Sequence, residues 1–396
     1  MAGILVLGLI ISSCTKEKDL EFSNNHFQTD NVLKSGKVND GSLTPLQLLG
    51  KKLFFDEISD PENVTACASC HGPSVGYTGP DPNAWINKGG SVYPGANGSF
   101  GNRKPPSAAY ATFSPVLYYD LAKRTFVGGN FWDGRATGER LGSPSAEQAL
   151  GPFLNPREHN VSSPLAVLMI IETSDYISMW ETVWGAPLSY STPDEIKLNY
   201  DRVGFAIAAY EGSSEVNQFS SKFDYSQKGD VKLTKEEKLG LQLFNSRGKC
   251  VLCHINKGKK PLFTDFTFAN LGVPINPVNP VYDWAPDFID LGLGGYLASR
   301  SDYASLASVN MGKQKVPTLR NVDKRPSIDF TKAYMHNGVF KSLKEVVHFY
   351  NTRDDGTWPA PEVSENLDTN VGNLGLTDAE EDAIVAFLKT LSDGYN

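Results

Sequence analysis

The pattern of apolar and polar positions predicts a helix that begins directly after Thr44. Thr44 suits the N-cap of a helix, and Pro45 suits the first helical turn. Leu46, Leu49 and Leu53 then recur at the three- and four-residue spacing of one helix face. A capping residue, a proline and an apolar stripe in this order indicate an amphipathic helix that packs one face against a core.

A matching helix is predicted in the second half of the chain, which points to an internal repeat. Thr234 is the expected N-cap, and Glu237 completes a capping box. Residues 49–54 (LGKKLF) correspond to residues 239–244 (LGLQLF), and each copy is followed by a short loop and a C-x-x-C-H motif. The same series of elements, present twice, suggests two related domains.

Each half also closes with a capped helix, which begins after Thr192 in the first half and after Thr377 in the second. A stretch rich in Ser, Asn, Gln and Lys, residues 215–230, lies between the two halves. We therefore expect two domains, residues 44–220 and residues 221–396.

Long glycine- and proline-rich segments lie between the predicted helices, at residues 72–106 and 272–295. They lack the alternation of a strand and the stripe of a helix, so they predict irregular coil. The expected fold class is therefore mostly α with long irregular loops.

The N-terminus has the pattern of an export signal. Residues 3–11 are nearly all apolar, a run too short to span a bilayer but suited to a signal peptide. Residues 11–14 (ISSC) resemble a bacterial lipobox, which would place a lipid anchor on Cys14, although no Lys or Arg precedes the apolar run. The alternative is a cleaved secretory signal. We expect residues 1–14 to be the signal peptide and residues 15–43 a polar tether in the periplasm.

Composition narrows the class of protein. The chain has 396 residues, of which 40% are hydrophobic and 21% charged, as in ordinary globular proteins. Its formal net charge of −8 argues against nucleic acid as a partner.

Four of the five cysteines form the two C-x-x-C-H motifs. This spacing lets two thiols attach to the vinyl groups of one haem, while the adjacent histidine binds the iron. Zinc is the alternative, but it leaves both histidines unexplained. The expected cofactors are two covalent c-type haems, the first at Cys67, Cys70 and His71, and the second at Cys250, Cys253 and His254.

The chain resembles the bacterial di-haem cytochrome c peroxidase and MauG family from Thr44 to Leu391. One stretch that carries the resemblance is residues 131–135 (FWDGR). The resemblance implies two cytochrome-c-like domains, each with one haem, and implies that Trp132 lies between the haems and relays electrons.

A second stretch, residues 147–158, reproduces the family spacing of Gln148, Pro152 and Glu158. The resemblance makes Glu158 the acid/base candidate and Gln148 a hydrogen-bond partner of peroxide at the first haem. Taken alone, Glu158 would be a surface loop carboxylate and Gln148 a solvated helix residue. The interval after Trp132 is longer than in the family, and we interpret residues 141–146 as a loop insertion.

Many family members carry a histidine that blocks the first iron, but residues 72–151 of this chain contain no histidine. We expect the first iron to be five-coordinate or water-bound at rest. His159 is the nearest residue that could bind it, and we expect it to be a hydrogen-bonded loop residue instead.

The second haem is expected to have a tyrosine as its distal ligand. Residues 315–322 (KVPTLRNV) and 334–340 (YMHNGVF) resemble the closing motif of the family. The resemblance places Tyr350 at the position of the distal methionine of the peroxidases. MauG also has a tyrosine at this position. The rivals are Met335, His348 and an empty position with Tyr350 merely packed.

The resemblance further implies a calcium ion between the haems, bound through Thr331 and the carbonyl of Ala333. The asparagine ligand of the family falls on Lys104, with Asn102 close by.

The predicted function is reduction of hydrogen peroxide to water, with electrons from a small periplasmic donor, a cytochrome or cupredoxin, entering at the second haem. The alternatives are a MauG-like enzyme that oxidises residues of a partner protein and a non-catalytic electron carrier. The resemblance leaves a homodimer open.

Overall fold

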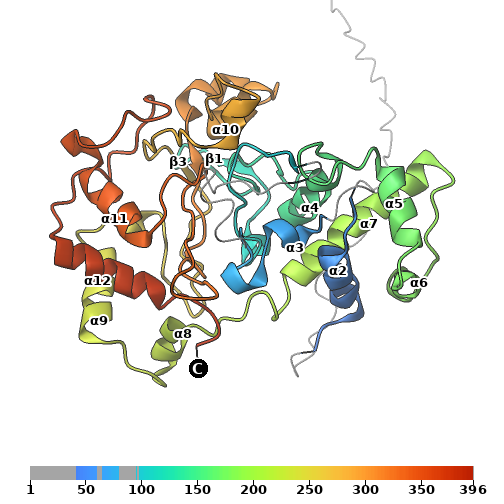
Figure 1. The fold of residues 1–396 in the computed structure, drawn as a ribbon, viewed down its shortest axis with the longest axis horizontal. Helices are drawn as coiled ribbons and strands as arrows, with labels where there is room; N and C mark the ends of the chain where they lie inside the picture. The colour runs from blue at the N-terminus through green and yellow to red at the C-terminus, as the bar shows by residue number, and fades with distance from the viewer. Residues whose placement is uncertain (1–41, 60–64, 80–94, 96–97, 396) are drawn as a thin grey trace, which may run out of the picture. The chain divides into compact units, whose positions relative to one another are not determined.

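The computed structural model describes residues 42–59, 65–79, 95 and 98–395, all within the unit Val38–Asn396. They are mostly helical, with a few short strands (Figure 1), which confirms the expected fold class at this level. The predicted signal peptide with Cys14, and residues 15–41 of the predicted tether, lie outside the described residues. No helix in the described part of the chain is long and apolar enough to span a bilayer.

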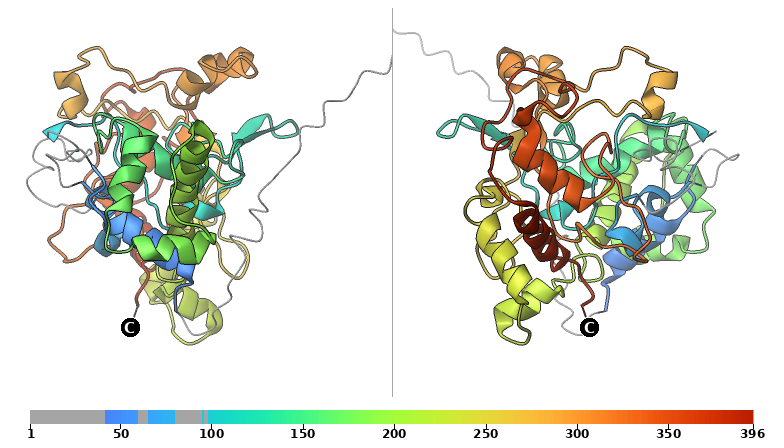
Figure 2. Two further views of the ribbon diagram at one scale, coloured as in Figure 1. Left: turned by 90° about the vertical axis from the view of Figure 1, so that its right-hand side faces the viewer. Right: turned by 60° about the vertical axis from the view of Figure 1, so that its left-hand side comes forward.

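The first half forms a group of helices around α7 (Figure 2, left). The helices α2, α4 and α5 pack against α7, while α6 packs against α2. Their apolar side chains form one hydrophobic cluster. The helices of this group are α2 (Pro45–Phe55), α4 (Pro144–Leu154), α5 (Pro164–Glu172), α6 (Ile177–Trp184) and α7 (Pro193–Glu211).

The second half has its own cluster, in which α12 packs against both α9 and α11 (Figures 1 and 2). The helices of this half are α8 (Lys222–Lys228), α9 (Lys235–Phe244), α10 (Gly292–Ala298), α11 (Leu343–Thr352) and α12 (Asp378–Lys389). The helix α8 lies inside the polar stretch at residues 215–230.

The four predicted helix starts are confirmed. The hydroxyl of Thr44 accepts a hydrogen bond from the backbone N–H of Gln47 at the start of α2. Thr192, Thr234 and Thr377 each form a capping box, at the starts of α7, α9 and α12. These caps satisfy N–H groups that a helix start leaves without an intrahelical partner.

The glycine of the repeated Leu-Gly pair lets two helices cross in close contact in both halves. A Cβ atom on Gly50 would lie 1.8 Å from the carbonyl oxygen of Ala206, where α2 crosses α7. A Cβ atom on Gly240 would lie 1.9 Å from the carbonyl oxygen of Ala383, where α9 crosses α12. Each crossing therefore requires glycine, because any side chain would push the two helices apart.

Short elements join the two groups. The strands β1 (Tyr118–Asp120) and β2 (Thr125–Val127) form one antiparallel pair, and β3 (Phe268–Ala269) and β4 (Gln314–Lys315) form another. Strand β2 contacts β3, so a segment of each half meets there.

Two loop predictions need correction. The interpretation of residues 141–146 as a loop insertion is wrong from Pro144 onward, because Ser143 caps α4 and Pro144 begins it. The coil predicted for residues 272–295 ends early, since α10 begins at Gly292. It also contains a short 3-10 helix, η6 (Pro280–Asp283).

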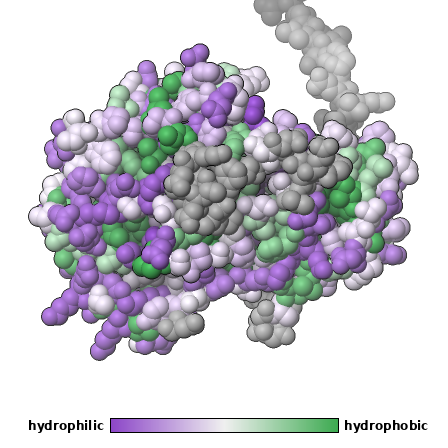
Figure 3. All heavy atoms as spheres, viewed as in Figure 1, coloured by the Kyte–Doolittle hydropathy of each residue, from purple (hydrophilic) through white to green (hydrophobic). Residues whose placement is uncertain are grey.

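On the face shown in Figure 3, hydrophilic residues predominate over the described surface, and hydrophobic residues form small separate patches. This distribution agrees with the acidic, ordinary globular composition of the chain.

Candidate functional site

Both motif histidines are prepared in the same way to bind a metal. The Nδ1 atom of His71 lies 3.1 Å from the carbonyl oxygen of Tyr77, and that of His254 lies 2.8 Å from the carbonyl oxygen of Phe263. Because a carbonyl only accepts, Nδ1 carries the proton and Nε2 keeps its lone pair. Burial lowers the pKa of His71 to about 4 and also lowers that of His254, so both rings are neutral.

The motif cysteines are all free thiols that lie beside their histidines. Cys67 and Cys70 are the ends of α3 (Cys67–Cys70), and Cys250 begins the short 3-10 helix η5 (Cys250–Leu252). Burial raises the pKa of all four thiols. Two half-buried thiols three residues apart and next to a histidine suit covalent attachment to one haem.

A pocket of about 1230 Å³, open to solvent, lies in front of the second motif. Cys250, Cys253 and His254 line it on one side, and Tyr350 and Met335 line it elsewhere. Its size and apolar lining suit a large planar cofactor. The described residues contain no group of three or more His, Cys, Asp or Glu placed to hold a metal ion together, which leaves zinc without a ligand set.

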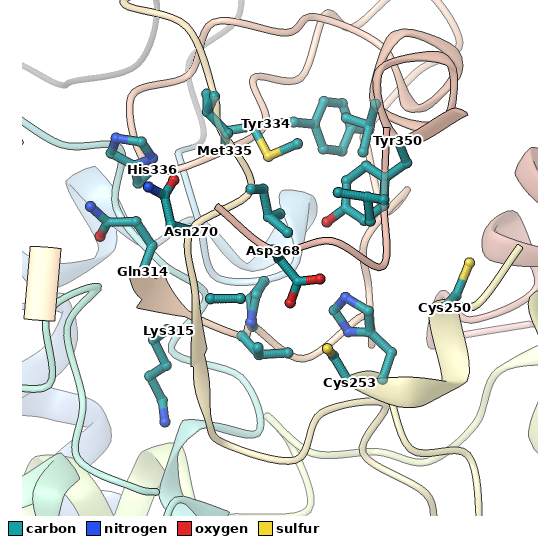
Figure 4. A pocket seen from close by; sticks show the side chains of 18 of the residues that line it. Cys250, Cys253, Asn270, Gln314, Lys315, Tyr334, Met335, His336, Tyr350 and Asp368 are labelled. Atoms are coloured by element: carbon teal, nitrogen blue, oxygen red, sulfur yellow. The ribbon is translucent and has the colours of Figure 1, made fainter. Parts of the chain in front are cut away.

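Of the three residues considered as distal ligands, two face this cavity. Figure 4 shows the hydroxyl of Tyr350 and the carboxylate of Asp368 directed into the space beside Cys253, with Met335 at the opposite end of the group. His348 is not among the lining residues, and its Nδ1 lies 2.9 Å from a carboxylate oxygen of Glu381. The geometry thus favours Tyr350 or Met335 over His348.

The pKa of the Tyr350 phenol is raised, first by burial and then by the nearby motif thiols and Asp368. Attachment of a haem would convert those thiols to uncharged thioethers. A ferric iron opposite His254 would favour the phenolate.

A smaller cavity of about 650 Å³ lies in front of the first motif. His71, Trp132 and Gln148 line it, so three of the predicted site residues meet there. Pro152 lies one turn beyond Gln148 on α4. None of the other described lining residues is a histidine, methionine or cysteine, although Tyr110 and Lys315 also line the cavity. Both are engaged elsewhere, because the Tyr110 hydroxyl donates to Asp393 at 2.6 Å and Lys315 Nζ donates to Ser114 Oγ at 3.1 Å.

Glu158 follows α4 and lies near the first motif, although it is not among the residues that line the smaller cavity. Burial is the largest cause of the raised pKa values of Cys67 and Cys70. The carboxylate of Glu158 is close enough to raise both values further. Burial raises the pKa of Glu158 itself, while Arg135 and a 2.7 Å hydrogen bond from Asn155 Nδ2 act in the opposite direction.

His159 is a buried loop residue whose ring is held by a backbone carbonyl. It is 3% exposed, and its Nδ1 lies 2.6 Å from the carbonyl oxygen of Ile58. The expectation of a hydrogen-bonded loop residue is therefore met.

Trp132 lines both cavities. Its indole Nε1 donates to the carbonyl oxygen of Lys104 at 2.7 Å, and its ring lies 6.4 Å from the ring of His336. Lys315 and Val316 also line both cavities, so the two cofactor sites are separated by a thin wall of side chains.

A buried chain of ions surrounds Trp132. Arg103 donates to both carboxylate oxygens of Asp290 and to Asp133, each at 2.6 Å. His336 continues the chain, with Nε2 3.2 Å from Glu362 and 4.0 Å from Asp290. No local pattern predicts this network, because its members lie in loops far apart in the sequence.

Two lysines, Lys104 and Lys332, lie where calcium is expected. The side chain of Lys104 donates to Thr78 Oγ1 at 2.6 Å and to the carbonyl oxygen of Pro105 at 3.1 Å. Lys332, between Thr331 and Ala333, is also buried there. Calcium prefers six to eight oxygen ligands that include carboxylates, and ammonium groups repel it.

Residues 45–232 match the family model of the di-haem cytochrome c peroxidases. The chain is 32% identical over 369 residues to the methylamine utilization protein MauG of Paracoccus denitrificans, with 88% of each chain covered. It is 30% identical to a cytochrome c551 peroxidase of Pseudomonas aeruginosa, over 81% of this chain and 75% of that protein.

Among solved structures, the chain is similar to the diheme peroxidase BthA of Burkholderia thailandensis. The TM-score is 0.74 at 30% identity, with 89% of this chain and 87% of that chain covered. Together with the paired motifs and their two cavities, these similarities identify the chain as an oxidoreductase that belongs to the di-haem cytochrome c peroxidase family.

Proposed function

We propose that the protein reduces hydrogen peroxide to two molecules of water, and that the two electrons come from a small donor protein. The reaction consumes two protons as well, so the site must deliver protons and electrons to the same place. We place the enzyme in the periplasm, tethered through a lipid on Cys14. The two haems supply the iron centres that bind peroxide and hold the electrons.

The observation that carries this proposal is the first cavity. His71 lies on it with a neutral ring, and no histidine, methionine or cysteine among the other described lining residues competes with a substrate. The hydroxyl of the lining tyrosine, Tyr110, is engaged by Asp393. Gln148 lines the same cavity and can donate a hydrogen bond to peroxide. A cavity built in this way binds a small oxygen ligand, whereas a pure electron carrier needs both axial positions filled.

Glu158 is the group that we assign to proton transfer. Cleavage of the O–O bond requires a proton to leave one oxygen and a proton to reach the other. Burial raises the pKa of Glu158 above that of an exposed glutamate, which brings it closer to the working pH. Asn155 holds the carboxylate in one orientation through its 2.7 Å hydrogen bond.

Electrons reach this site from the second cavity. Trp132 lies in the wall between the cavities and offers an aromatic ring on the path. We assign Tyr350 and His254 as the residues that would hold the iron of the second haem. An anionic phenolate stabilises ferric iron and lowers the reduction potential relative to a methionine ligand.

Tyr350 also favours a second candidate, a MauG-like enzyme that uses peroxide to oxidise residues of a partner protein. The similarity to a protein named MauG supports this candidate, while the similarity to cytochrome c551 peroxidase supports the first. A low potential at the second haem would make reduction by a donor harder.

Stopped-flow spectroscopy of the diferric protein with peroxide separates these functions, with and without a reduced small cytochrome. Rapid reaction and continued oxidation of the cytochrome support the peroxidase. A long-lived oxidised state with little cytochrome turnover supports the MauG-like enzyme. No reaction with peroxide would contradict both and favour a carrier. The Glu158→Gln variant is measured in parallel. A reaction with peroxide at the first haem site should slow in this variant, whereas a reaction elsewhere should not.

A further inference from the structure

Lys332 is the most deeply buried lysine around the first haem site, and its surroundings are built for a cation. The residue is 5% exposed. Its Nζ donates to the carbonyl oxygens of Val75 at 2.9 Å, Asn321 at 2.9 Å and Lys324 at 3.1 Å. An ammonium has three N–H groups and a neutral amine has two, so three carbonyl acceptors match the charged form.

These carbonyls come from both halves of the chain. Val75 belongs to the loop after the first motif, whereas Asn321 and Lys324 belong to the segment beside the second haem site. The two segments also touch directly, since a Cβ atom on Gly76 would lie 2.7 Å from Cβ of Asn321. Lys332 thus joins the two halves at a place where their segments touch.

The second lysine, Lys104, holds the other end of the same loop. Its ammonium donates to Thr78 Oγ1 at 2.6 Å, three residues after Val75. Between these two points lies Tyr77, whose carbonyl oxygen accepts from His71 Nδ1. The two lysines therefore fix the turn that orients the first proximal histidine.

A metal ion has no place in this arrangement. Three carbonyl oxygens at this place already accept from Lys332, and a divalent ion would be repelled by two ammonium groups. Burial lowers the pKa of Lys332 and brings the pKa of Lys104 to about 7, and the charge of Lys104 lowers the pKa of Lys332 further, so the two cations already disfavour each other. Another positive charge would increase this repulsion.

We propose that the ammonium groups of Lys332 and Lys104 replace a metal ion between the two halves, so that the protein holds its first haem site without calcium. The lysines act as positioning residues, through the loop that carries Tyr77. The effect on His71 rests on the proposed placement of the first haem, but the absence of calcium does not.

The test begins with the metal content of the purified holoprotein. We expect no stoichiometric calcium by mass spectrometry of the metals. EGTA, and then added calcium chloride, should leave the thermal midpoint and the spectra of both ferric haems unchanged. One calcium ion retained per chain, or a spectral change on EGTA treatment that calcium reverses, would overturn the proposal whatever the enzyme does with peroxide.

Lys332→Met and Lys104→Met test the positioning role, with Lys123→Met on the exposed β1–β2 turn as the matched control. We expect the two buried variants to lower the thermal midpoint and to alter the spectrum of the first haem more than that of the second. The control should change neither. If the buried variants fold and keep the parent spectrum at the first haem, the lysines do not hold the site; if they do not fold, the calcium measurement still decides.

Discussion

The indole of Trp132 is fixed by the backbone of Lys104, whose carbonyl oxygen accepts from Nε1 at 2.7 Å. The backbone N–H of the same lysine donates to the carbonyl oxygen of His336 at 2.7 Å. His336 lines the second cavity and Trp132 lines both. One residue of an irregular loop therefore fixes the aromatic ring between two cofactor sites.

Trp132→Phe tests this arrangement. The variant keeps an aromatic ring but leaves the Lys104 carbonyl without its donor, which should cost about 1–3 kcal/mol of folding stability. We expect both haems to be retained and electron transfer between them to slow, measured as the rate at which the first haem is reduced after the second. Trp184→Phe, on α6 away from both cavities, is the control. Equal rates in the parent and the Trp132 variant would remove Trp132 from the electron path.

The number of haems attached at each motif can be measured. The double change Cys250→Ser and Cys253→Ser should leave one of two haems, by pyridine haemochrome and by protein mass. The equivalent change at Cys67 and Cys70 should remove the other haem. A bound zinc ion in the parent protein in place of haem would contradict the whole assignment.

The distal ligand of the second haem can be assigned by a pair of substitutions. Tyr350→Phe should change the spectrum of the second haem and raise its reduction potential, because the phenolate that stabilises ferric iron is lost. Met335→Leu should change neither. The reverse pattern would make Met335 the ligand and Tyr350 a packed side chain.

The pH dependence of the peroxide reaction should follow Glu158. Burial raises the pKa of Glu158, so its carboxylate becomes protonated at a higher pH than an exposed glutamate does. Only the carboxylate can accept the proton, so the rate should fall at that higher pH as the solution is made more acidic. Asn155→Ala removes a hydrogen bond that favours the carboxylate. Since this bond favours the charged form, the acid limb should move to higher pH in the variant. An unmoved limb would mean that another group sets it.

Local signals made part of the structure predictable. Thr44 and Thr234 cap helices that the apolar stripes also indicate, and the repeated Leu-Gly pair anticipated two equivalent helix crossings. The same logic would have found α4, because Ser143 precedes Pro144 as Thr44 precedes Pro45.

The buried ion chain could not be found in this way. Arg103 and Asp290 are 187 residues apart and both lie in loops, whose course depends on tertiary contacts rather than on periodicity. Lys332 likewise lacks any local signal. A lysine is ordinarily exposed, and only the folded backbone brings the three carbonyl oxygens to its ammonium.

Glu158→Gln separates proton transfer from packing at the first haem. Glutamine keeps the shape of the side chain and can still bond to Asn155, but it cannot carry a proton. General acid–base groups typically contribute about 10²–10⁴-fold, so reactivity with peroxide should fall by that order. Both haems, the thermal midpoint and reduction of the second haem should stay as in the parent.

Gln148→Ala is the graded comparison. It should cost less than Glu158→Gln, because a hydrogen bond to peroxide tunes the step without supplying the proton. Both rates are measured by stopped-flow spectroscopy at one pH, well above the acid limb. At that pH a changed pKa of Glu158 does not lower the rate, so a slower reaction reports the loss of the side chain itself. If Glu158→Gln reacts at the parent rate, Glu158 is a loop carboxylate only. The proton must then pass through another group, and His159 would be tested next, although its Nδ1 is engaged by Ile58.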